Sequence, residues 1–259
     1  MHHRPGRRVQ LHRAVAKLGW GSRTQAWEWV RAGQVRVDGR VVTDPLIWVD
    51  LDAQQITRAG TTAAPVPPLT LALHKPRGVV TTRRDERGRR TVYDLLPAGL
   101  PWLFPVGRLD ADSEGLLILT NDAGLAVRLT EPAHHLPKVY HVTVRGTPGA
   151  DSLARLRQGV RLADGLTRPA QVKVIAESPK DTVLEVVLTE GRNRQIRRMC
   201  AAVGHKVRRL VRVAVGGFQL DDLPPGASRV LNHAEVRRLT LDVAGRHKGA
   251  ARSPKRRLD

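Results

Sequence analysis

A proline-rich segment without a repeating apolar pattern divides the chain into two parts of unequal size. Residues 57–69 read TRAGTTAAPVPPL, with three prolines and several small residues. Such a stretch is typical of a linker, because it offers neither a helical nor a strand-like apolar face. We therefore expect a small domain at 8–57, a linker at 58–68 and a larger domain at 69–245, followed by a disordered basic tail at 246–259.

The charge of the chain favours a polyanionic partner. Among 259 residues, 44 Lys and Arg stand against 24 Asp and Glu, a formal net charge of +20 at pH 7. The field of so basic a protein attracts nucleic acid. An acidic membrane surface is the competing partner, but the sequence has no apolar run near ~18 residues and no signal-peptide pattern. We therefore expect a cytoplasmic protein with no membrane partner.

The cysteine and histidine content restricts the chemistry further. A single cysteine, Cys200, excludes an intramolecular disulfide and a cysteine-based zinc cluster, and it fits a reducing compartment. The adjacent pairs His2–His3 and His134–His135 lack a carboxylate at helical spacing and are typical of solvated histidines. We expect no metal site.

The small domain has the pattern of two short helices followed by a hairpin. The segment QLHRAVAKLG repeats apolar residues at helical spacing and ends in a glycine, and Ser22 is placed to cap a second helix, RTQAWEWVRAG. QVRVDGRVV then alternates apolar and polar residues around Asp38-Gly39, the pair that a type I′ turn prefers. The predicted RNA contacts on this scaffold are Arg13, Arg23 and Arg36, although a solvated basic surface is the alternative.

This order of elements resembles the α-L RNA-binding motif, first described in a small-subunit ribosomal protein. The resemblance covers about residues 9–56, and GSRTQAWEWVRAGQVRVDG is its most specific part. The sequence departs from the motif in Trp27 and Trp29, where smaller aliphatic residues are usual. Because this helix needs an apolar face, we expect both indoles in the core rather than as base-stacking platforms.

Two segments of the larger domain place charge beside strands. LTLALHKPRGVVTT begins as an apolar strand and turns sharply at Lys75-Pro76, which by itself is also common in purely structural turns. VGRLDADSEGLLILTND crowds four charged residues in front of an apolar strand. We expect Arg108 and Asp110 to share one strand face, since they are two residues apart, and Gly115 to permit a close backbone approach.

A third segment, EGRNRQIRRMCAAVGHKV, predicts a helix with one apolar and one cationic face. Apolar residues recur at i, i+3, i+4 and i+7, and Cys200 among them is expected in the core rather than as a nucleophile. Arginines at helical spacing suit phosphate contact, because a guanidinium forks onto pairs of oxygens. The cationic face is expected to consist of Arg194, Arg197 and Arg198.

KPRGVVTT, GRLDADSEGLLILTND, KVYHV and EGRNRQIRRM, in this order behind the α-L-like domain, resemble the RsuA type of pseudouridine synthases. The resemblance implies an α+β protein: a small helix-pair and hairpin domain, and a larger synthase domain on a mixed, mainly antiparallel sheet with an RNA-binding cleft. It implies a ribosomal RNA substrate. The implied reaction breaks the bond between ribose and the uracil nitrogen, turns the base and rejoins it through carbon, without cofactor or metal.

The same resemblance implies roles for individual residues. Asp110 of GRLD is the catalytic nucleophile or base, and Arg197 is the cation that keeps this carboxylate ionised. Tyr140 of KVYHV stacks on the uracil, although by propensity alone a strand tyrosine is core packing. Arg108 helps to displace the target nucleotide from the RNA stack. The full set of RNA contacts expected in this domain is Lys75, Arg108, Arg192, Arg194 and Arg198.

The sequence thus predicts a monomeric enzyme that converts a uridine of ribosomal RNA, preferably of the large subunit, to pseudouridine. The assembling ribosomal subunit is a further expected partner. A non-catalytic RNA-binding or ribosome-assembly factor on the same scaffold is the alternative. A DNA-binding protein is disfavoured, because the chain has no recognition helix with dimer signals.

Overall fold

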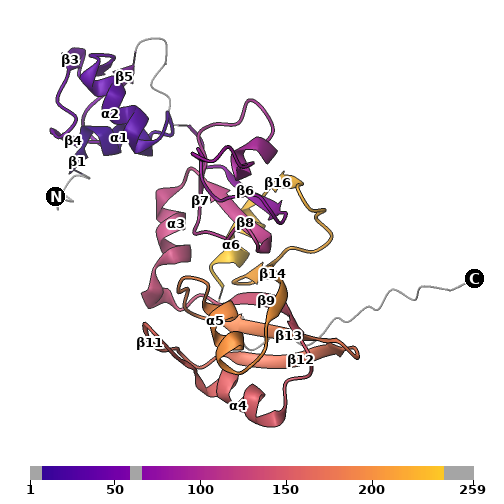
Figure 1. Cartoon of the computed structure of the whole chain (residues 1–259). Helices are drawn as coiled ribbons and strands as arrows, with labels where there is room; N and C mark the ends of the chain where they lie inside the picture. Colours follow the sequence, from indigo (N-terminus) through magenta and orange to yellow (C-terminus); the bar gives the residue numbers. More distant parts are fainter. Residues whose placement is uncertain (1–7, 59–65, 242–259) are drawn as a thin grey trace, which may run out of the picture. The chain divides into compact units, whose positions relative to one another are not determined.

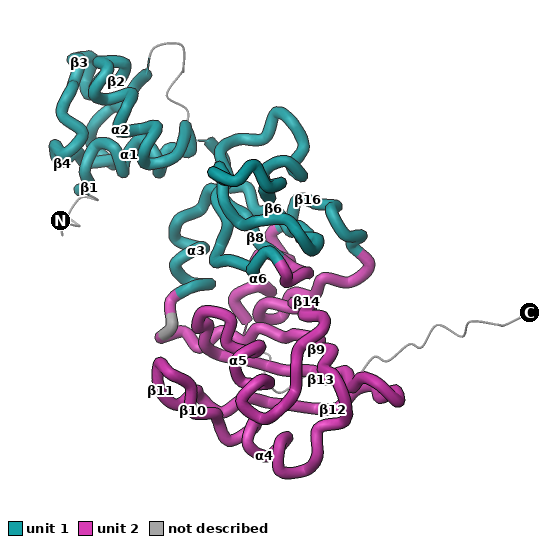
Figure 2. Tube along the Cα trace, in the orientation of Figure 1, with its two compact units in different colours: residues 1–111, 117–130, 223–232 teal, residues 112–116, 131–222, 233–259 magenta. Residues whose placement is uncertain are grey.

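The computed structural model describes residues 8–58 and 66–241, which fall into two compact units (Figures 1 and 2). The predicted tail at 246–259 and most of the predicted linker lie outside the described residues, so the predicted domain limits remain predictions. Unit 1 comprises residues 1–111, 117–130 and 223–232, and unit 2 comprises residues 112–116, 131–222 and 233–259.

The first 58 residues of unit 1 contain a small module with the predicted helix pair and hairpin. Ser22 caps the second helix by accepting the N–H of Gln25 at 3.2 Å, and the Gln25 side chain accepts the N–H of Ser22 at 3.0 Å. Asp38 and Gly39 have φ of 49° and 79°, which confirms the turn between the hairpin strands. The elements are β1 (Arg8–Gln10), α1 (Leu11–Lys17), α2 (Arg23–Arg31), β2 (Val35–Val37), β3 (Arg40–Val42), β4 (Trp48–Asp50) and β5 (Ile56–Arg58).

The module has a core of its own, and its tryptophans lie beside that core rather than in it. Ala26 and Val30, four residues apart, form the buried stripe of α2. Trp29 is half-buried with the Arg58 guanidinium 3.7 Å from its ring centre, whereas Trp27 is 38% exposed. The prediction that both indoles are core residues is therefore wrong for Trp27, because small side chains occupy the stripe of α2 that packs inward.

The rest of unit 1 is built around β6 (Thr70–Lys75). All six residues of this strand are buried, and it lies between β16 (Ser228–Val230), with which it pairs antiparallel, and β8 (Glu114–Thr120). The end of β8 pairs with the short β7 (Phe104–Pro105). The remaining elements of this part are the 3-10 turn η1 (Val92–Leu95) and α3 (Ala123–Thr130).

Unit 2 is a mixed, mainly antiparallel sheet with helices. Its strands follow the order β12-β13-β9-β14, each antiparallel to the next, and β14 then runs parallel to the first residues of β8. The sheet type predicted for the larger domain is confirmed. The elements are η2 (Pro132–His134), β9 (Lys138–Arg145), α4 (Ala150–Gln158), β10 (Arg161–Leu162), β11 (Gly165–Leu166), β12 (Gln171–Glu177), β13 (Asp181–Leu188), α5 (Gln195–Ala202), β14 (Val207–Val215), β15 (Phe218–Gln219) and α6 (His233–Leu239).

Helix α5 packs its predicted apolar face into the core of unit 2. Ile196, Met199, Cys200 and Val203 are all buried there, together with residues of β9, β13 and β14. The burial of Cys200 confirms its prediction as a core residue, and this burial raises the pKa of its thiol to about 12. Among the described residues, no helix is long and apolar enough to cross a membrane.

Candidate active site

The loop of residues 106–113 joins β7 to β8 and carries the charged residues of the GRLDADSEG motif. It is divided between the units, since Ala111 belongs to unit 1 and Asp112 to unit 2. The prediction that Arg108 and Asp110 share a strand face is wrong, because both residues precede β8 and have no strand conformation. Gly107, at φ 75°, turns the chain before them. Arg108 is exposed and Asp110 is half-buried.

In unit 1, hydrogen bonds hold the backbone on both sides of Asp110. The hydroxyl of Thr81 donates to the Leu109 carbonyl at 2.8 Å and accepts the Leu109 N–H at 3.3 Å. The N–H of Gly78 donates to the Ala111 carbonyl at 2.7 Å. Thr81 is 7% exposed, so these bonds are largely shielded from water. The segment that follows the KPRG turn therefore fixes the backbone at Asp110.

Lys75 belongs to this support rather than to the protein surface. Its side chain is fully buried, and its ammonium donates to the carbonyls of Pro76 at 2.9 Å and Val79 at 2.7 Å. A buried ammonium that binds two carbonyls closes the KPRG turn and does not reach a phosphate at the surface. We therefore replace the expected RNA contact at Lys75 with a structural role in this turn.

In unit 2, two arginines bind the carboxylate of Asp112. Arg194 makes a bidentate contact at 3.0 and 2.8 Å, and the Nε of Arg197 lies 3.3 Å from Asp112 Oδ2. Arg197 also donates to the Asp112 backbone carbonyl at 2.8 Å. The hydrogen bonds from Arg194, and then the positive charges of Arg197 and Arg194, lower the pKa of Asp112. The start of α5 thus fixes the loop immediately after Asp110 in the sequence.

The three predicted arginines do not form one cationic face of α5. Arg194 precedes the helix with a left-handed backbone at φ 47°, and Arg197 lies in the first turn. Arg198 makes a bidentate ion pair with Asp164 at 2.8 and 3.0 Å. Arg194 and Arg197 thus share the carboxylate of Asp112, whereas Arg198 binds a different one, so the expectation of one face shared by all three is wrong.

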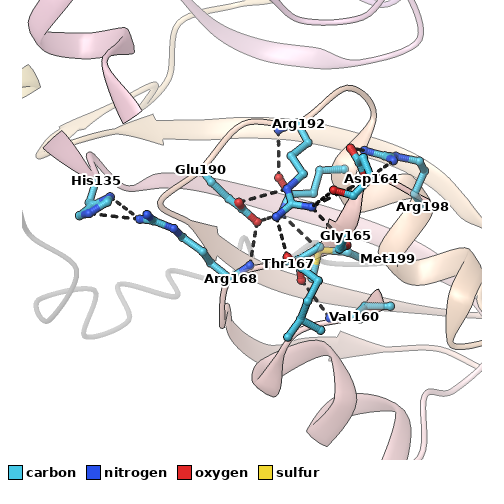
Figure 3. A network of polar contacts seen from close by, with 12 residues as sticks. His135, Val160, Asp164, Gly165, Thr167, Arg168, Glu190, Arg192, Arg198 and Met199 are labelled. Atoms are coloured by element: carbon cyan, nitrogen blue, oxygen red, sulfur yellow. Dashed lines mark hydrogen bonds and ion pairs between the residues drawn. The ribbon is translucent and has the colours of Figure 1, made fainter. Parts of the chain in front are cut away.

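Arg192, another predicted RNA contact, lies in a polar network of unit 2 (Figure 3). All three of its guanidinium nitrogens donate, the Nε to Glu190 at 3.2 Å and the others to carbonyls of the β10–β11 turn, including Leu166 at 2.6 Å. The same network includes the contact between His135 and Arg168. These bonds close the β10–β11 hairpin, so Arg192 has few donors left for RNA.

Tyr140 and Gly115 lie on the strands of unit 2. Tyr140, on β9, is half-buried against the core and faces Arg212 of β14 in the strand register. Gly115, at φ 106°, pairs with Arg212, and a Cβ there would lie 2.2 Å from the Arg212 carbonyl oxygen. The predicted close backbone approach at Gly115 is confirmed, and its partner is β14.

Two residues of the site were missed by sequence reasoning. Thr81 follows two valines in a segment that resembles a common strand and turn. No sequence pattern indicates that its hydroxyl binds the backbone of Leu109. Asp112 was not among the predicted site residues, and the only sequence signal for it was its place among the charged residues in front of the apolar strand. In the described part of the chain, no group of three or more His, Cys, Asp or Glu residues is arranged to hold a metal ion.

Comparisons with known proteins identify relatives along most of the chain. Residues 70–202 match the family model of RNA pseudouridylate synthases, and residues 10–45 match the S4 domain. The chain is 37% identical over 232 residues to ribosomal large subunit pseudouridine synthase B of Bacillus subtilis, covering 89% of this chain and 95% of that protein. It is 47% identical over 175 residues to ribosomal large subunit pseudouridine synthase E of Xanthomonas axonopodis, covering 61% of this chain and 90% of that protein. A solved pseudouridylate synthase, 28% identical, superposes with a TM-score of 0.65 over 89% of this chain and 99% of its own.

Proposed function

Because the chain belongs to the RsuA type of RNA pseudouridine synthases with an N-terminal S4 domain, we propose that it converts a specific uridine of ribosomal RNA to pseudouridine. Large-subunit RNA is the proposed substrate, since two relatives that this chain matches over most of their length are named for that subunit. The proposed location is the cytoplasm, which a ribosomal RNA substrate and the single cysteine both favour. We also propose that the enzyme is a monomer and that it acts on RNA of the assembling ribosomal subunit.

Asp110 is the proposed catalytic residue, either as the nucleophile that attacks the sugar or as the base that removes its proton. The observation that carries this assignment is the double anchorage of the loop. Thr81 and Gly78 hold the backbone at Leu109 and Ala111, and two arginines hold Asp112, two residues further along. A reaction without a cofactor gains most from groups whose positions are fixed before the substrate binds.

Arg197, Tyr140 and Arg108 have proposed roles in the same reaction. Arg197 is 13% exposed in its side chain, so its charge is poorly screened, and it is the proposed counter-ion of Asp110 while it binds Asp112. Tyr140 offers a half-buried ring for stacking on the uracil. Arg108 is exposed and is proposed to take the place of the nucleotide that leaves the RNA stack.

The arginines of the S4 domain are the proposed sequence-independent contacts. Arg13, Arg23 and Arg36 are all exposed, on α1, α2 and β2. Exposed guanidinium groups bind phosphate without reading bases, so they position the enzyme on its RNA. Arg194 and Arg198 hold carboxylates in the structure and would have to exchange Asp112 or Asp164 for phosphate in order to bind RNA.

Pseudouridine formation on transcribed ribosomal RNA fragments tests this proposal. Asp110→Asn keeps the size of the side chain and removes its ionisable group, so product should fall to background while RNA affinity and folding are retained. Asp222→Asn changes an exposed turn carboxylate and serves as the matched control. Wild-type product from a well-folded Asp110→Asn protein would exclude the catalytic role of this residue. No product from the wild type on any fragment would favour a non-catalytic RNA-binding or assembly factor.

Two further variants separate the proposed roles. Arg197→Met should be nearly inactive, because it removes the proposed counter-ion and both contacts of Arg197 with Asp112. Tyr140→Phe keeps the ring and should lose less activity than Tyr140→Ala if stacking is its main role. Equal losses from both tyrosine variants would indicate that the hydroxyl group matters instead.

A further inference from the structure

Unit 1 contains a cluster of arginines that is separate in sequence from the residues of the candidate active site. Between β6 and η1, residues 83–90 read RRDERGRR and contain five arginines and two acidic residues. All five arginines are exposed. We call residues 82–91 the arginine loop.

The carboxylate of Asp85 organises the arginine loop from within. It accepts the backbone N–H groups of Arg87 at 3.1 Å and Arg89 at 2.9 Å, and it binds the Arg89 guanidinium at 3.0 and 2.6 Å. The Asp85 side chain is only 8% exposed, so the acid lies beneath the loop while the arginines face solvent. The contact with Arg89 is the main cause that lowers the pKa of Asp85 to about 2.

The two ends of the arginine loop are held as well. The N–H of Val80 donates to the Arg90 carbonyl at 3.0 Å, and Val92 donates back to Val80 at 3.0 Å. Near the other end, the Arg83 guanidinium lies 4.1 Å from the ring centre of Trp102, and Trp102 stacks on a further aromatic ring, that of Tyr93. A cation over an aromatic face is held in place without losing its charge.

Three cations of the arginine loop are left to bind something other than protein. Arg89 is paired with Asp85 and Arg83 is stacked, but no carboxylate of residues 8–58 or 66–241 pairs with Arg84, Arg87 or Arg90. Exposed guanidinium groups on a loop of fixed shape suit the paired oxygens of phosphodiesters. Guanidinium groups of this kind bind the phosphates rather than the bases, so contact with the backbone of the nucleic acid is the mode that the chemistry of the loop supports.

We propose that the arginine loop is a phosphate-binding site for an RNA strand, additional to the S4 domain and formed in advance by Asp85. This proposal rests on the proposed function for the nature of the polyanion. It assigns the site a sequence-independent role: the loop adds affinity and salt dependence and does not choose the uridine.

Binding of a fluorescein-labelled uridine dodecamer, followed by anisotropy over a range of salt concentrations, tests the site. Arg84→Gln/Arg87→Gln/Arg90→Gln should reduce the slope of log affinity against log salt by about 2, because each single-strand phosphate contact contributes roughly 0.7. Arg161→Gln/Lys173→Gln/Lys180→Gln removes the same charge from exposed positions of unit 2 and should change the slope by less than half as much. Equal changes from the two triple variants, or an unchanged slope in the loop variant, would overturn the proposal.

Asp85→Asn tests the pre-formed shape of the arginine loop. The substitution makes the protein more positive, so charge alone predicts tighter RNA binding. Loss of the internal contacts of Asp85 instead predicts several-fold weaker binding, which is the expected result. Tighter binding would show that the loop acts only through its net charge. The dodecamer measures binding alone, so this test is independent of catalysis. If the loop variants weaken dodecamer binding but the wild type forms no pseudouridine in any ribosomal fragment, the proposed function is excluded and the phosphate-binding site is supported.

Discussion

Thr81 and Leu109 exchange two hydrogen bonds, in which one hydroxyl both donates to and accepts from the same backbone residue. Leu109 directly precedes Asp110, so the position of the proposed catalytic carboxylate depends on a side chain that lies 28 residues before Leu109. The hydroxyl of Thr81 is buried, where a hydrogen bond is stronger than at the surface and its loss is correspondingly costly.

Thr81→Val should therefore impair catalysis more than folding. Valine keeps the shape of the side chain but leaves the Leu109 N–H and carbonyl without the hydroxyl, which should lower the free energy of unfolding by about 1–3 kcal/mol. Because small misplacements of a reacting group are costly, kcat should fall by roughly 10-fold to 100-fold. Thr81→Ser retains the hydroxyl and should keep most of the activity. Urea unfolding and single-turnover kinetics would decide, and equal activity of the two variants would show that the hydroxyl does not position Asp110.

The ion pairs of Asp112 should make stability depend on pH in a defined direction. The pKa of Asp112 is lowered in the folded protein, so its contribution is fully present above its unfolded value of about 4 and is lost as pH falls through the folded value. Asp112→Asn should accordingly lower the free energy of unfolding at pH 6, and its difference from the wild type should shrink toward pH 3. Urea unfolding at both pH values measures this. Asp222→Asn, at an exposed turn, should show a smaller difference at pH 6, and a constant difference for Asp112→Asn would contradict the role of its charge.

The pairing of Gly115 with Arg212 should make residue 115 intolerant of a side chain. In Gly115→Ala the new Cβ would lie 2.2 Å from a backbone oxygen, in addition to the strain of φ 106°. Gly204→Ala, at φ 89° with nothing within 4 Å, has the strain alone and should cost about 1–2 kcal/mol in the free energy of unfolding. Gly115→Ala should cost roughly 1–3 kcal/mol more than this control. Similar unfolding midpoints for the two variants would mean that β8 can move away from β14 at little cost.

Removal of the N-terminal module should weaken RNA binding without unfolding the rest of the chain. The module has its own buried core within residues 8–58, so a protein lacking residues 1–60 should retain the stability of the remaining elements. Each lost phosphate contact should reduce the salt slope of RNA binding by roughly 0.7 on single strands or 0.9 on duplex. An unchanged affinity and slope would show that Arg13, Arg23 and Arg36 do not contact RNA.

Local features were predictable from the sequence because their causes lie within a few residues. The I′ turn at Asp38-Gly39, the helix cap at Ser22 and the apolar face of α5 each follow from local sequence alone. The core prediction for Trp27 failed because helical periodicity shows which residues share an apolar face. It does not show which of those side chains the neighbouring helix has room to bury.

Features that depend on distant partners were not predictable in this way. The resemblance marked Asp110 and Arg197 as catalytic candidates, but the contacts of Arg194 with Asp112 join residues 82 positions apart. The sequence likewise suggested surface roles for Lys75 and Arg192, whereas Lys75 is buried and closes the KPRG turn, and Arg192 closes a hairpin. A charged side chain looks the same in a sequence whether its partner is phosphate or a backbone carbonyl.

The burial of Cys200 has a practical consequence. The one thiol of the chain lies 2% exposed in the core of unit 2, and its raised pKa leaves almost no thiolate near neutral pH. We therefore expect the protein to react with maleimides as slowly as a cysteine-free protein. A cysteine introduced at an exposed position of each unit, such as Val41 and Ile175, would accept a pair of fluorophores without any change to the core. Energy transfer between the two dyes could then follow, in solution, how the units respond when RNA is added.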